Sequence, residues 1–134
     1  MKGILVDSNI IIDVFLNDPI WADWSESTLE KYIHYATLYI NSIVYSEISI
    51  GFELIEDLEF AIAKAGFQML EIPKEALFLA GKVYLEYKKR RGVKRTPLPD
   101  FYIGAQAAVL NLQLITRDVS RYRSYFPTVE LITP

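Results

Sequence analysis

Four acidic residues in this sequence, Asp7, Glu47, Asp100 and Asp118, lie in settings where carboxylates could do chemistry. The runs "GILVDSNIII" and "LQLITRD" are apolar, have the length of a strand and stop abruptly at Asp7 and Asp118. Glu47 borders an apolar helical stripe, and Asp100 opens a segment rich in small residues. Because carboxylate oxygens are the ligands that Mg²⁺ and Mn²⁺ prefer, these acids could together hold a hard divalent ion.

Each of these acids also has an ordinary structural explanation. An aspartate after a strand can cap the next helix or close an Asx-turn. An aspartate in a first helical turn interacts favourably with the helix dipole, so for Asp100 alone capping is favoured. Glu47 forms an i, i+4 row with Ile43 and Gly51 and should be partly buried, and a salt bridge to a Lys or Arg at the edge of the core would explain it equally well.

The remaining acids are expected to be structural. Asp13 lies off the helical face of Asp7, and we expect it to have no catalytic role. Another eight acids lie in polar surroundings typical of solvated helix faces: Asp23, Glu26, Glu30, Glu56, Asp57, Glu59, Glu75 and Glu86. The lone His34 is expected at the surface or at the edge of the core.

The elements that must position the four acids follow from hydrophobic periodicity. We expect strands at residues 3–6, "LYINS", "FQMLEI", "LQLIT" and "TVELI". Helices are expected at residues 8–16, 24–35, 43–55, 57–65, 73–91 and 100–110. This alternation predicts one α/β domain over residues 1–134, with a mostly parallel central sheet of about five strands and helices on both faces.

This topology could bring the four acids to one end of the sheet. In open parallel sheets, ligands bind beyond the carboxyl ends of the strands, where Asp7 and Asp118 are predicted. Carboxylates gathered there would repel one another without a cation. With zero Cys and one His, the oxygen-only donor set points to Mg²⁺ or Mn²⁺ and not to zinc.

Composition bounds the setting of this chemistry. A chain of 134 residues with 51% hydrophobic residues is globular and can bury a sizeable core. No apolar run approaches the roughly 20 residues needed to cross a bilayer, and the first apolar run is too short for a signal peptide. We therefore expect a cytoplasmic protein without a membrane partner, and the absence of Cys agrees with that location.

The net charge of −3 hides a local basic run. Six of the fourteen Lys and Arg residues lie in "KKRRGVKR", residues 88–95, just before Asp100. The end of a helix explains the first four, because cations there face the negative end of the dipole. Lys94 and Arg95 lie beyond Gly92, so we predict that Lys89, Arg91, Lys94 and Arg95 bind nucleic-acid phosphates.

Four segments of the sequence carry a family resemblance. "VDSNIIID", "SIVYSEI", "PLPDFYIGAQA" and "LITRD" resemble, in order, the four motif blocks of the PIN-domain nucleases, particularly the small toxin ribonucleases of the VapC type. The resemblance implies a Mg²⁺-dependent endoribonuclease, the toxin component of a type II toxin-antitoxin system. It further implies a cognate antitoxin protein as partner and, commonly, a homodimer.

Carried over by position, the resemblance assigns roles to six residues. Asp7, Glu47, Asp100 and Asp118 match the acidic centre, and Asn9 and Thr116 match polar residues that support it. Asp7 would be the central metal ligand, Asp100 and Asp118 would complete the site, and Glu47 could hold a second ion or orient the attacking water. A metal-activated water would then hydrolyse an RNA phosphodiester and leave a 5′-phosphate and a 3′-hydroxyl. Some relatives carry a further acid after the last aspartate, where this chain has Ser120 and Arg121, which weakens the case for a second metal ion.

Two other readings stay open. In the first, the acids are caps and ion-pair partners of a non-catalytic module that binds RNA or protein, and its nine Tyr could stack on bases. In the second, the chain is an aspartyl-phosphate phosphatase or a receiver-like domain. The stretch "VDSN" argues against the second reading, because it has neither a second Asp two positions after Asp7 nor an adjacent acidic pair.

Overall fold

The computed structural model describes residues 2–134, in which strands and helices alternate. The strands are β1 (Lys2–Val6), β2 (Ala36–Ile40), β3 (Gln68–Met69), β4 (Gln113–Ile115) and β5 (Leu131–Ile132). The helices are α1 (Ser8–Phe15), α2 (Ala22–Ile33), α3 (Ser42–Ser49), α4 (Ile55–Ala65), α5 (Lys74–Lys89), α6 (Pro99–Leu110) and α7 (Ser120–Tyr125).

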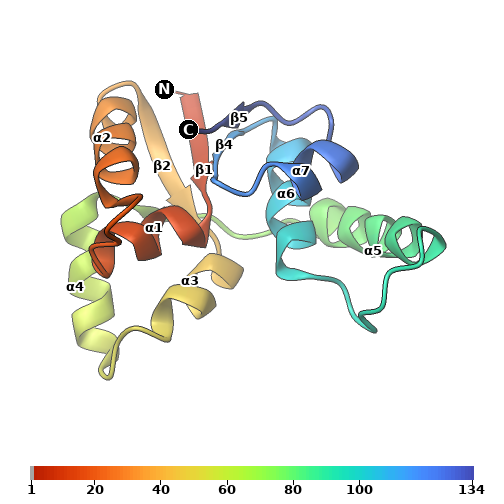
Figure 1. Cartoon of the computed structure of the whole chain (residues 1–134), viewed down its shortest axis with the longest axis horizontal. Coiled ribbons are helices and arrows are strands. Elements are labelled where there is room, and N and C mark those ends of the chain that lie inside the picture. The colour runs from red at the N-terminus through yellow and green to blue at the C-terminus, as the bar shows by residue number, and fades with distance from the viewer. Residues whose placement is uncertain (1) are drawn as a thin grey trace.

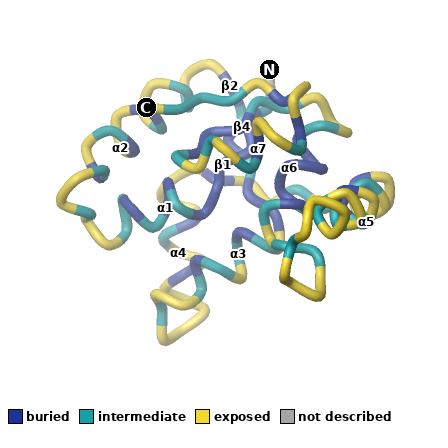
Figure 2. The backbone as a smooth tube through the Cα atoms, turned by 45° about the vertical axis from the view of Figure 1, so that its right-hand side comes forward, coloured by how far each residue is buried: buried dark blue, intermediate teal, exposed yellow. Residues whose placement is uncertain are grey.

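The five strands form one parallel sheet in the order β3-β2-β1-β4-β5. Helices α1, α2 and α4 lie on one side of this sheet, and α5, α6 and α7 lie on the other (Figure 1). The central strands β1 and β4 are buried (Figure 2), as expected for a parallel sheet covered on both faces. The predicted α/β class and five-stranded parallel sheet are confirmed.

The register of the sheet places two loops side by side. Val6 pairs with Ile115, and the backbone amide of Asp7 donates to the Ile115 carbonyl over 2.9 Å. The residues that follow β1 and β4, Asp7 and Thr116, are therefore neighbours. Beyond β2, the buried Asn41 caps α3 through the Val44 amide at 2.9 Å, so α3 starts at the same edge of the sheet.

One predicted helix is wrong in its extent. The apolar stripe of residues 43–55 predicted a single helix, but α3 ends at Ser49 and α4 begins at Ile55. Gly51 lies in the turn between them, where a residue without a Cβ weakens a helix. Phe52 leaves the helical path and packs edge-on against the ring of Phe15, with the ring centroids 5.6 Å apart.

Other boundaries also differ from the sequence prediction. Strands β3 and β5 have only two residues each, and β2 ends at Ile40 because Asn41 caps α3. Helix α5 stops at Lys89, and Arg91, not Gly92, takes the left-handed conformation, with φ 67°. Gly92 is needed for space, since an added Cβ would lie 2.2 Å from the Tyr87 ring.

Helix α7 was not predicted. Its sequence "SRYRSY" is polar and too short to show an apolar period, and its only buried residue is Tyr122. The chain after α7 packs on α6, where the Phe126 ring lies against Gly104. A Cβ added to Gly104 would lie only 2.3 Å from that ring. This contact holds α7 beside the first turn of α6. Within residues 2–134, none of the helices combines the length and the apolarity that crossing a membrane requires.

Candidate active site

Asp7 is the buried centre of the site, with 3% of its surface exposed. Its Oδ2 accepts hydrogen bonds from Thr116 Oγ1 at 2.8 Å and Tyr122 Oη at 2.9 Å, with Asn9 Nδ2 at 3.4 Å. Its Oδ1 accepts only the Ser8 amide at 2.8 Å among the residues that the structure describes. A carboxylate oxygen offers about two lone pairs, so Oδ1 is the atom left with acceptor capacity.

Glu47 reaches the same site from α3. Its Oε1 accepts a hydrogen bond from Ser8 Oγ at 3.0 Å, and no salt bridge to Glu47 forms within residues 2–134. The salt bridge considered for this residue is therefore not observed. Ser8 contacts both acids, because its amide binds Asp7 and its hydroxyl binds Glu47.

Asp100 enters the site from the first turn of α6. It does not cap the helix through its side chain, since the N-cap residue is Leu98 and no side-chain cap bond forms there. Its Oδ1 lies 3.5 Å from the Tyr122 hydroxyl, and its Oδ2 lies 3.8 Å from Arg121 Nε. The capping that Asp100 alone would favour is thus replaced by contacts to α7.

Asp118 lies in the loop after β4 and is exposed. Its backbone amide donates to Thr116 Oγ1 at 3.0 Å, and the same hydroxyl donates to Asp7. Asn9 joins the two loops, because its Oδ1 accepts from the Arg117 amide at 3.3 Å and its Nδ2 reaches Thr116 at 3.4 Å. The two residues predicted to support the acids, Asn9 and Thr116, both contact Asp7.

Asp13, in α1, anchors the loop after β4 through Arg117. It is 2% exposed, and Arg117 binds it through two bonds, Nε to Oδ2 at 2.7 Å and Nη2 to Oδ1 at 2.8 Å. Ser25 Oγ donates to the same carboxylate at 2.8 Å, and the Arg117 guanidinium lies 5.1 Å from the Trp21 ring centre. The expectation that Asp13 is structural agrees with this geometry.

Burial, and after it the charges of neighbouring acids, raise the pKa values of three of these carboxylates. Burial, together with the negative charges of Asp7 and Asp118, raises the pKa of Asp100 to about 6, while Arg121 lowers it. Burial also raises the pKa of Asp7, although the Thr116 and Tyr122 hydrogen bonds lower it. The pKa of Glu47 is raised by burial and by Asp7, and the Ser8 bond lowers it. These couplings place Asp7, Glu47, Asp100 and Asp118 within one electrostatic field, which we call the acidic centre.

The donor chemistry of the acidic centre fits a hard cation. Its groups are carboxylate oxygens, and a divalent ion would offset the burial and repulsion of the charges that raise the pKa values of Asp7, Glu47 and Asp100. Within residues 2–134, no three acidic or histidine side chains are already gathered closely enough to hold an ion. The arrangement is therefore an acidic cluster and not a preassembled metal cage. His34 is exposed at the end of α2 and is not part of it.

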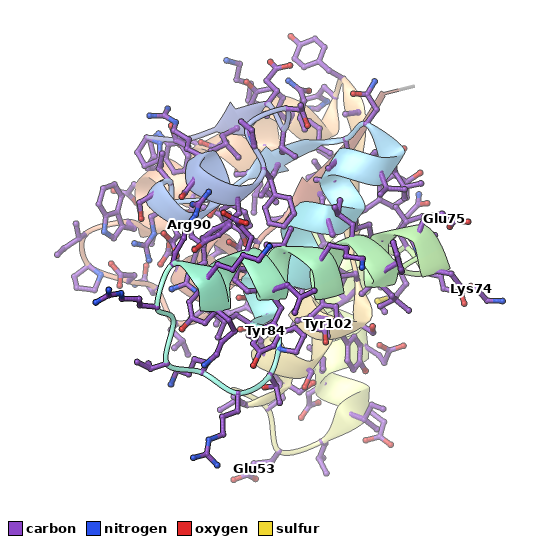
Figure 3. All side chains as sticks on the ribbon, turned by 90° about the vertical axis from the view of Figure 1, so that its right-hand side faces the viewer. Glu53, Lys74, Glu75, Tyr84, Arg90 and Tyr102 are labelled. Carbon is purple, nitrogen blue, oxygen red and sulfur yellow. The ribbon has the colours of Figure 1, made fainter. Side chains whose placement is uncertain are left out.

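The basic run divides into two groups. Lys88 and Arg90 are engaged at the helix end, because Lys88 Nζ donates to the Gly92 carbonyl at 2.9 Å and Arg90 binds Glu86 and Ser124. The other four basic side chains are exposed and have no side-chain partner among the described residues: Lys89, Arg91, Lys94 and Arg95. Figure 3 shows Arg90 at the end of α5 and the loop that runs from there past Tyr84 to α6.

Sequence reasoning missed three residues of this site. Ser8 lies inside the quoted "VDSN" next to Asp7, so the signal for it was present. Tyr122 and Arg121 had no such signal, because α7 was not predicted. The eight acids expected on solvated helix faces are all exposed: Asp23, Glu26, Glu30, Glu56, Asp57, Glu59, Glu75 and Glu86.

The fold is similar to those of several solved structures. VapBC2 from Rickettsia felis, bound to a DNA fragment from their promoter, matches with a TM-score of 0.76 and 18% identity over 99% of each chain. A toxin-antitoxin complex from Klebsiella pneumoniae matches at 0.70 and 26%, over 97% of this chain and 96% of that chain. VapBC-1 from nontypeable Haemophilus influenzae matches at 0.72 and 19%, over 98% of each chain. A comparison with curated proteins gave no significant match.

The family model of the PIN domain matches residues 4–125, which include the acidic centre. The resemblance carried by the four sequence blocks is confirmed by this match. The extension of the domain to residues 1–134 stays a prediction, although β5 joins the sheet beyond the matched range. Since the match covers most of the chain and the sheet has the corresponding fold, this protein belongs to the PIN domain family.

Proposed function

We propose that this protein is a Mg²⁺- or Mn²⁺-dependent endoribonuclease and the toxin of a type II toxin-antitoxin system. The observation that carries the proposal is the setting of Asp7, a buried carboxylate whose Oδ1 accepts one hydrogen bond and has acceptor capacity left for a cation, with three further acids in its field. Membership of the PIN domain family supports the nuclease assignment. The absence of Cys agrees with a cytoplasmic location.

Each residue of the acidic centre has a proposed role. Asp7 is the central ligand through Oδ1, while Thr116 and Asn9 hold its Oδ2 side in place. Asp100 and Asp118 complete the ligand set. When bound, Mg²⁺ or Mn²⁺ would lower the pKa of water and stabilise charge that develops on the phosphate.

Two alternative roles are proposed for Glu47. Ser8 orients its carboxylate from the Asp7 side, and its raised pKa makes it a better proton acceptor than an ordinary glutamate near neutral pH. It either orients the attacking water or holds a second ion. Hydrolysis would leave a 5′-phosphate and a 3′-hydroxyl.

Lys89, Arg91, Lys94 and Arg95 are the proposed RNA-binding residues. Their charges are exposed and unpaired within the described part of the chain. Lys88 and Arg90, in contrast, already donate hydrogen bonds to the Gly92 carbonyl and to Ser124. Cations that no protein acid neutralises are free to replace counterions on a phosphate backbone. The loop joins α5 to α6, so it leads directly to Asp100.

We propose an antitoxin as the protein partner. The similar Klebsiella structure is described as a toxin-antitoxin complex. In this chain an apolar pocket of about 440 Å³ adjoins Glu47, and Phe15, Ile48 and Phe52 contribute to its lining. A partner segment with apolar side chains could fill this pocket and cover the acidic centre.

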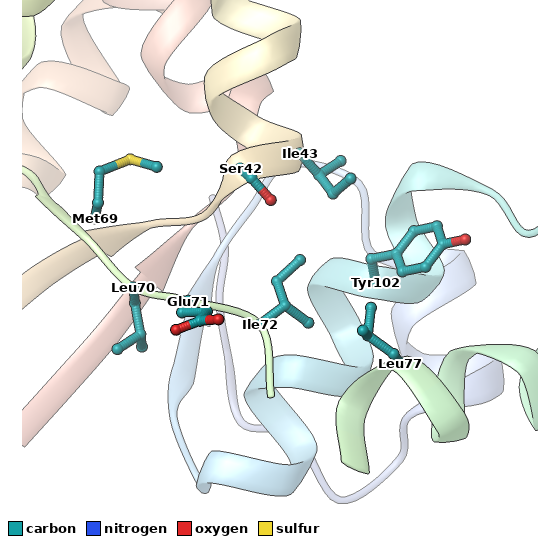
Figure 4. Close-up of a pocket in the computed structure, with 8 residues that line it drawn as sticks. All are labelled: Ser42, Ile43, Met69, Leu70, Glu71, Ile72, Leu77 and Tyr102. Carbon is teal, nitrogen blue, oxygen red and sulfur yellow. The ribbon is translucent and has the colours of Figure 1, made fainter. Parts of the chain in front are cut away.

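A homodimer is also part of the proposal. A pocket of about 610 Å³ lies between α3, the segment after β3, α5 and α6 (Figure 4). Met69 and Leu77 line this pocket and are 52% and 46% exposed, so it opens on an apolar part of the surface. We assign this face to a second copy, and light scattering of the purified protein tests that assignment.

The nuclease proposal is tested with purified protein and an unstructured RNA oligonucleotide. Cleavage is expected with Mg²⁺ or Mn²⁺, and none with EDTA or with Asp7→Asn. The cut ends should carry a 5′-phosphate, which ligation to an adaptor detects. In cells, sequencing of RNA ends after brief induction, beside Asp7→Asn, identifies the target. Binding of RNA without cleavage under any divalent ion would favour the non-catalytic module instead.

A further inference from the structure

Arg121 is the one cation that pairs with the acidic centre within residues 2–134. Its Nε lies 3.8 Å from Asp100 Oδ2, whereas the other ion pairs of Arg side chains are to Asp13 and Glu86. The Arg121 side chain is 34% exposed and that of Asp100 is 28% exposed. The guanidinium therefore lies at the solvent edge of the acidic centre.

The donors of Arg121 are not used by the protein. It makes no hydrogen bond to any described residue, and at 3.8 Å its contact with Asp100 is electrostatic. By contrast, the Arg117 guanidinium donates two hydrogen bonds to Asp13, and Arg90 binds Glu86 and Ser124. Arg121 thus combines a defined place beside the acids with unoccupied N–H groups.

Aromatic rings hold Arg121 in this place. Its guanidinium lies 5.8 Å from the ring centres of both Tyr87 and Phe101. The hydroxyl of Tyr87 also accepts hydrogen bonds from the backbone amides of Val93 and Lys94, at 3.1 and 3.3 Å. One side chain therefore supports both Arg121 and the loop that carries the basic run, so the two lie on the same flank of the acidic centre.

We propose that Arg121 binds a phosphate of the RNA next to the acidic centre, as the last cation of the path that the basic run begins. The inference rests on the proposed nuclease function and adds a substrate-binding residue to it. Carboxylates alone repel a phosphodiester, and a guanidinium at their edge offsets that repulsion. The planar fork of Arg matches two phosphate oxygens, which a Lys ammonium cannot do in the same way.

The test compares Arg121→Gln with Arg121→Lys and with the control Arg123→Gln. Arg123 is exposed on the same helix and makes no contact with the acidic centre, so its replacement removes the same charge from α7. Melting temperatures verify that each variant folds. The readouts are KM and kcat for an RNA oligonucleotide, RNA binding against salt with EDTA on an Asp7→Asn background, and Mg²⁺ binding by calorimetry.

Arg121→Gln should raise KM roughly tenfold, as expected for loss of a charge-assisted hydrogen bond, and lower the log–log salt slope by about 0.7. Arg121→Lys should keep the slope and recover KM only in part, while Arg123→Gln should match wild type. Mg²⁺ should bind Arg121→Gln at least as tightly as wild type, because a competing cation has been removed.

Two results overturn the inference. Equal KM and salt slope for Arg121→Gln and Arg123→Gln would show that Arg121 touches no phosphate. Loss of Mg²⁺ binding together with a fall in kcat would show that Arg121 positions Asp100 instead. If wild type cleaves no RNA, the nuclease proposal fails, but the binding experiment still decides whether Arg121 contacts phosphate.

Discussion

The buried hydroxyl of Tyr122 donates a hydrogen bond of 2.9 Å to Oδ2 of Asp7. The same oxygen lies 3.5 Å from Oδ1 of Asp100, so one phenol lies between two carboxylates that repel each other. Burial and these charges raise the pKa of Tyr122 well above its usual value, which keeps the phenol protonated as a donor. Tyr122 therefore holds two members of the acidic centre together without a metal ion.

Tyr122→Phe should destabilise the protein by about 1–3 kcal/mol at pH 7, because a buried charged carboxylate loses a donor. It should also raise the pKa of Asp7 further, since the Tyr122 bond lowers that pKa. Urea denaturation measures the first effect. Tyr125→Phe is the matched control, because its hydroxyl has no partner within residues 2–134. Equal stability of the two variants would contradict this role for Tyr122.

The stability of the metal-free protein should depend on Asp100 between pH 4 and 7. Its folded pKa of about 6 exceeds the ordinary 3.8, so the folded state binds this proton more tightly than the unfolded state. The resulting penalty is absent below about pH 3.8 and complete above about pH 6. Asp100→Asn removes it, so the gain in stability over wild type should grow from near zero at about pH 4 to on the order of 3 kcal/mol at about pH 7.

Denaturant midpoints in EDTA at a series of pH values measure this effect. Glu30→Gln, an exposed acid on α2, serves as the control. Parallel pH profiles for wild type and Asp100→Asn would show that Asp100 is not held in the field of the other acids.

Asp7→Asn should abolish cleavage without destabilising the metal-free protein. Burial of the ionised group is relieved, and the Thr116 and Tyr122 hydroxyls can turn to accept from the new amide. Mg²⁺ at about a hundred times its Kd should raise the Tm of wild type by roughly 5–10 °C and leave the variant unchanged. Calorimetry with and without Mg²⁺ measures both. A large loss of stability with activity kept would make Asp7 a structural cap.

Asp13→Ala should cost about 3 kcal/mol, because Arg117 loses both of its bonds and Ser25 loses its acceptor. The loop with Thr116 and Asp118 is tied to this pair, so Mg²⁺ binding should weaken as well. Urea denaturation and calorimetry are the measurements. The control Asp57→Ala changes an exposed acid on α4. A change no larger than that of the control would mean that the Arg117 contact contributes little.

Replacement of Lys89, Arg91, Lys94 and Arg95 by Gln should weaken RNA binding irrespective of sequence. The log–log salt slope should fall by at most about 3, at roughly 0.7 for each phosphate contact. Binding is measured against salt on an Asp7→Asn background, so that RNA is not consumed. Lys31→Gln and Lys64→Gln, exposed positions on α2 and α4, are the charge controls. Slopes equal to those of the controls would assign the basic run to the helix end alone.

The sequence by itself was sufficient for the class of fold. It also singled out Asp7, Glu47, Asp100 and Asp118, whose role in a metal site stays a prediction. Short apolar runs alternating with amphipathic helices leave few arrangements other than a covered parallel sheet. Asp7 follows one such run and Thr116 ends another, and the observed pairing of β1 with β4 makes the two residues neighbours. Hydrophobic periodicity failed at the break between α3 and α4, because the apolar stripe of residues 43–55 continues through the turn that separates the two helices.

Only the tertiary structure decided what surrounds each carboxylate. Tyr122 lies 115 residues from Asp7 along the chain, and its place depends on α7, which the Phe126–Gly104 contact holds against α6. Arg117 likewise meets Asp13 across 104 residues. Periodicity reports which face of an element is buried, but it carries no information on which distant side chain meets that face. The partners that set the charge of the acidic centre are therefore properties of packing and not of any local pattern.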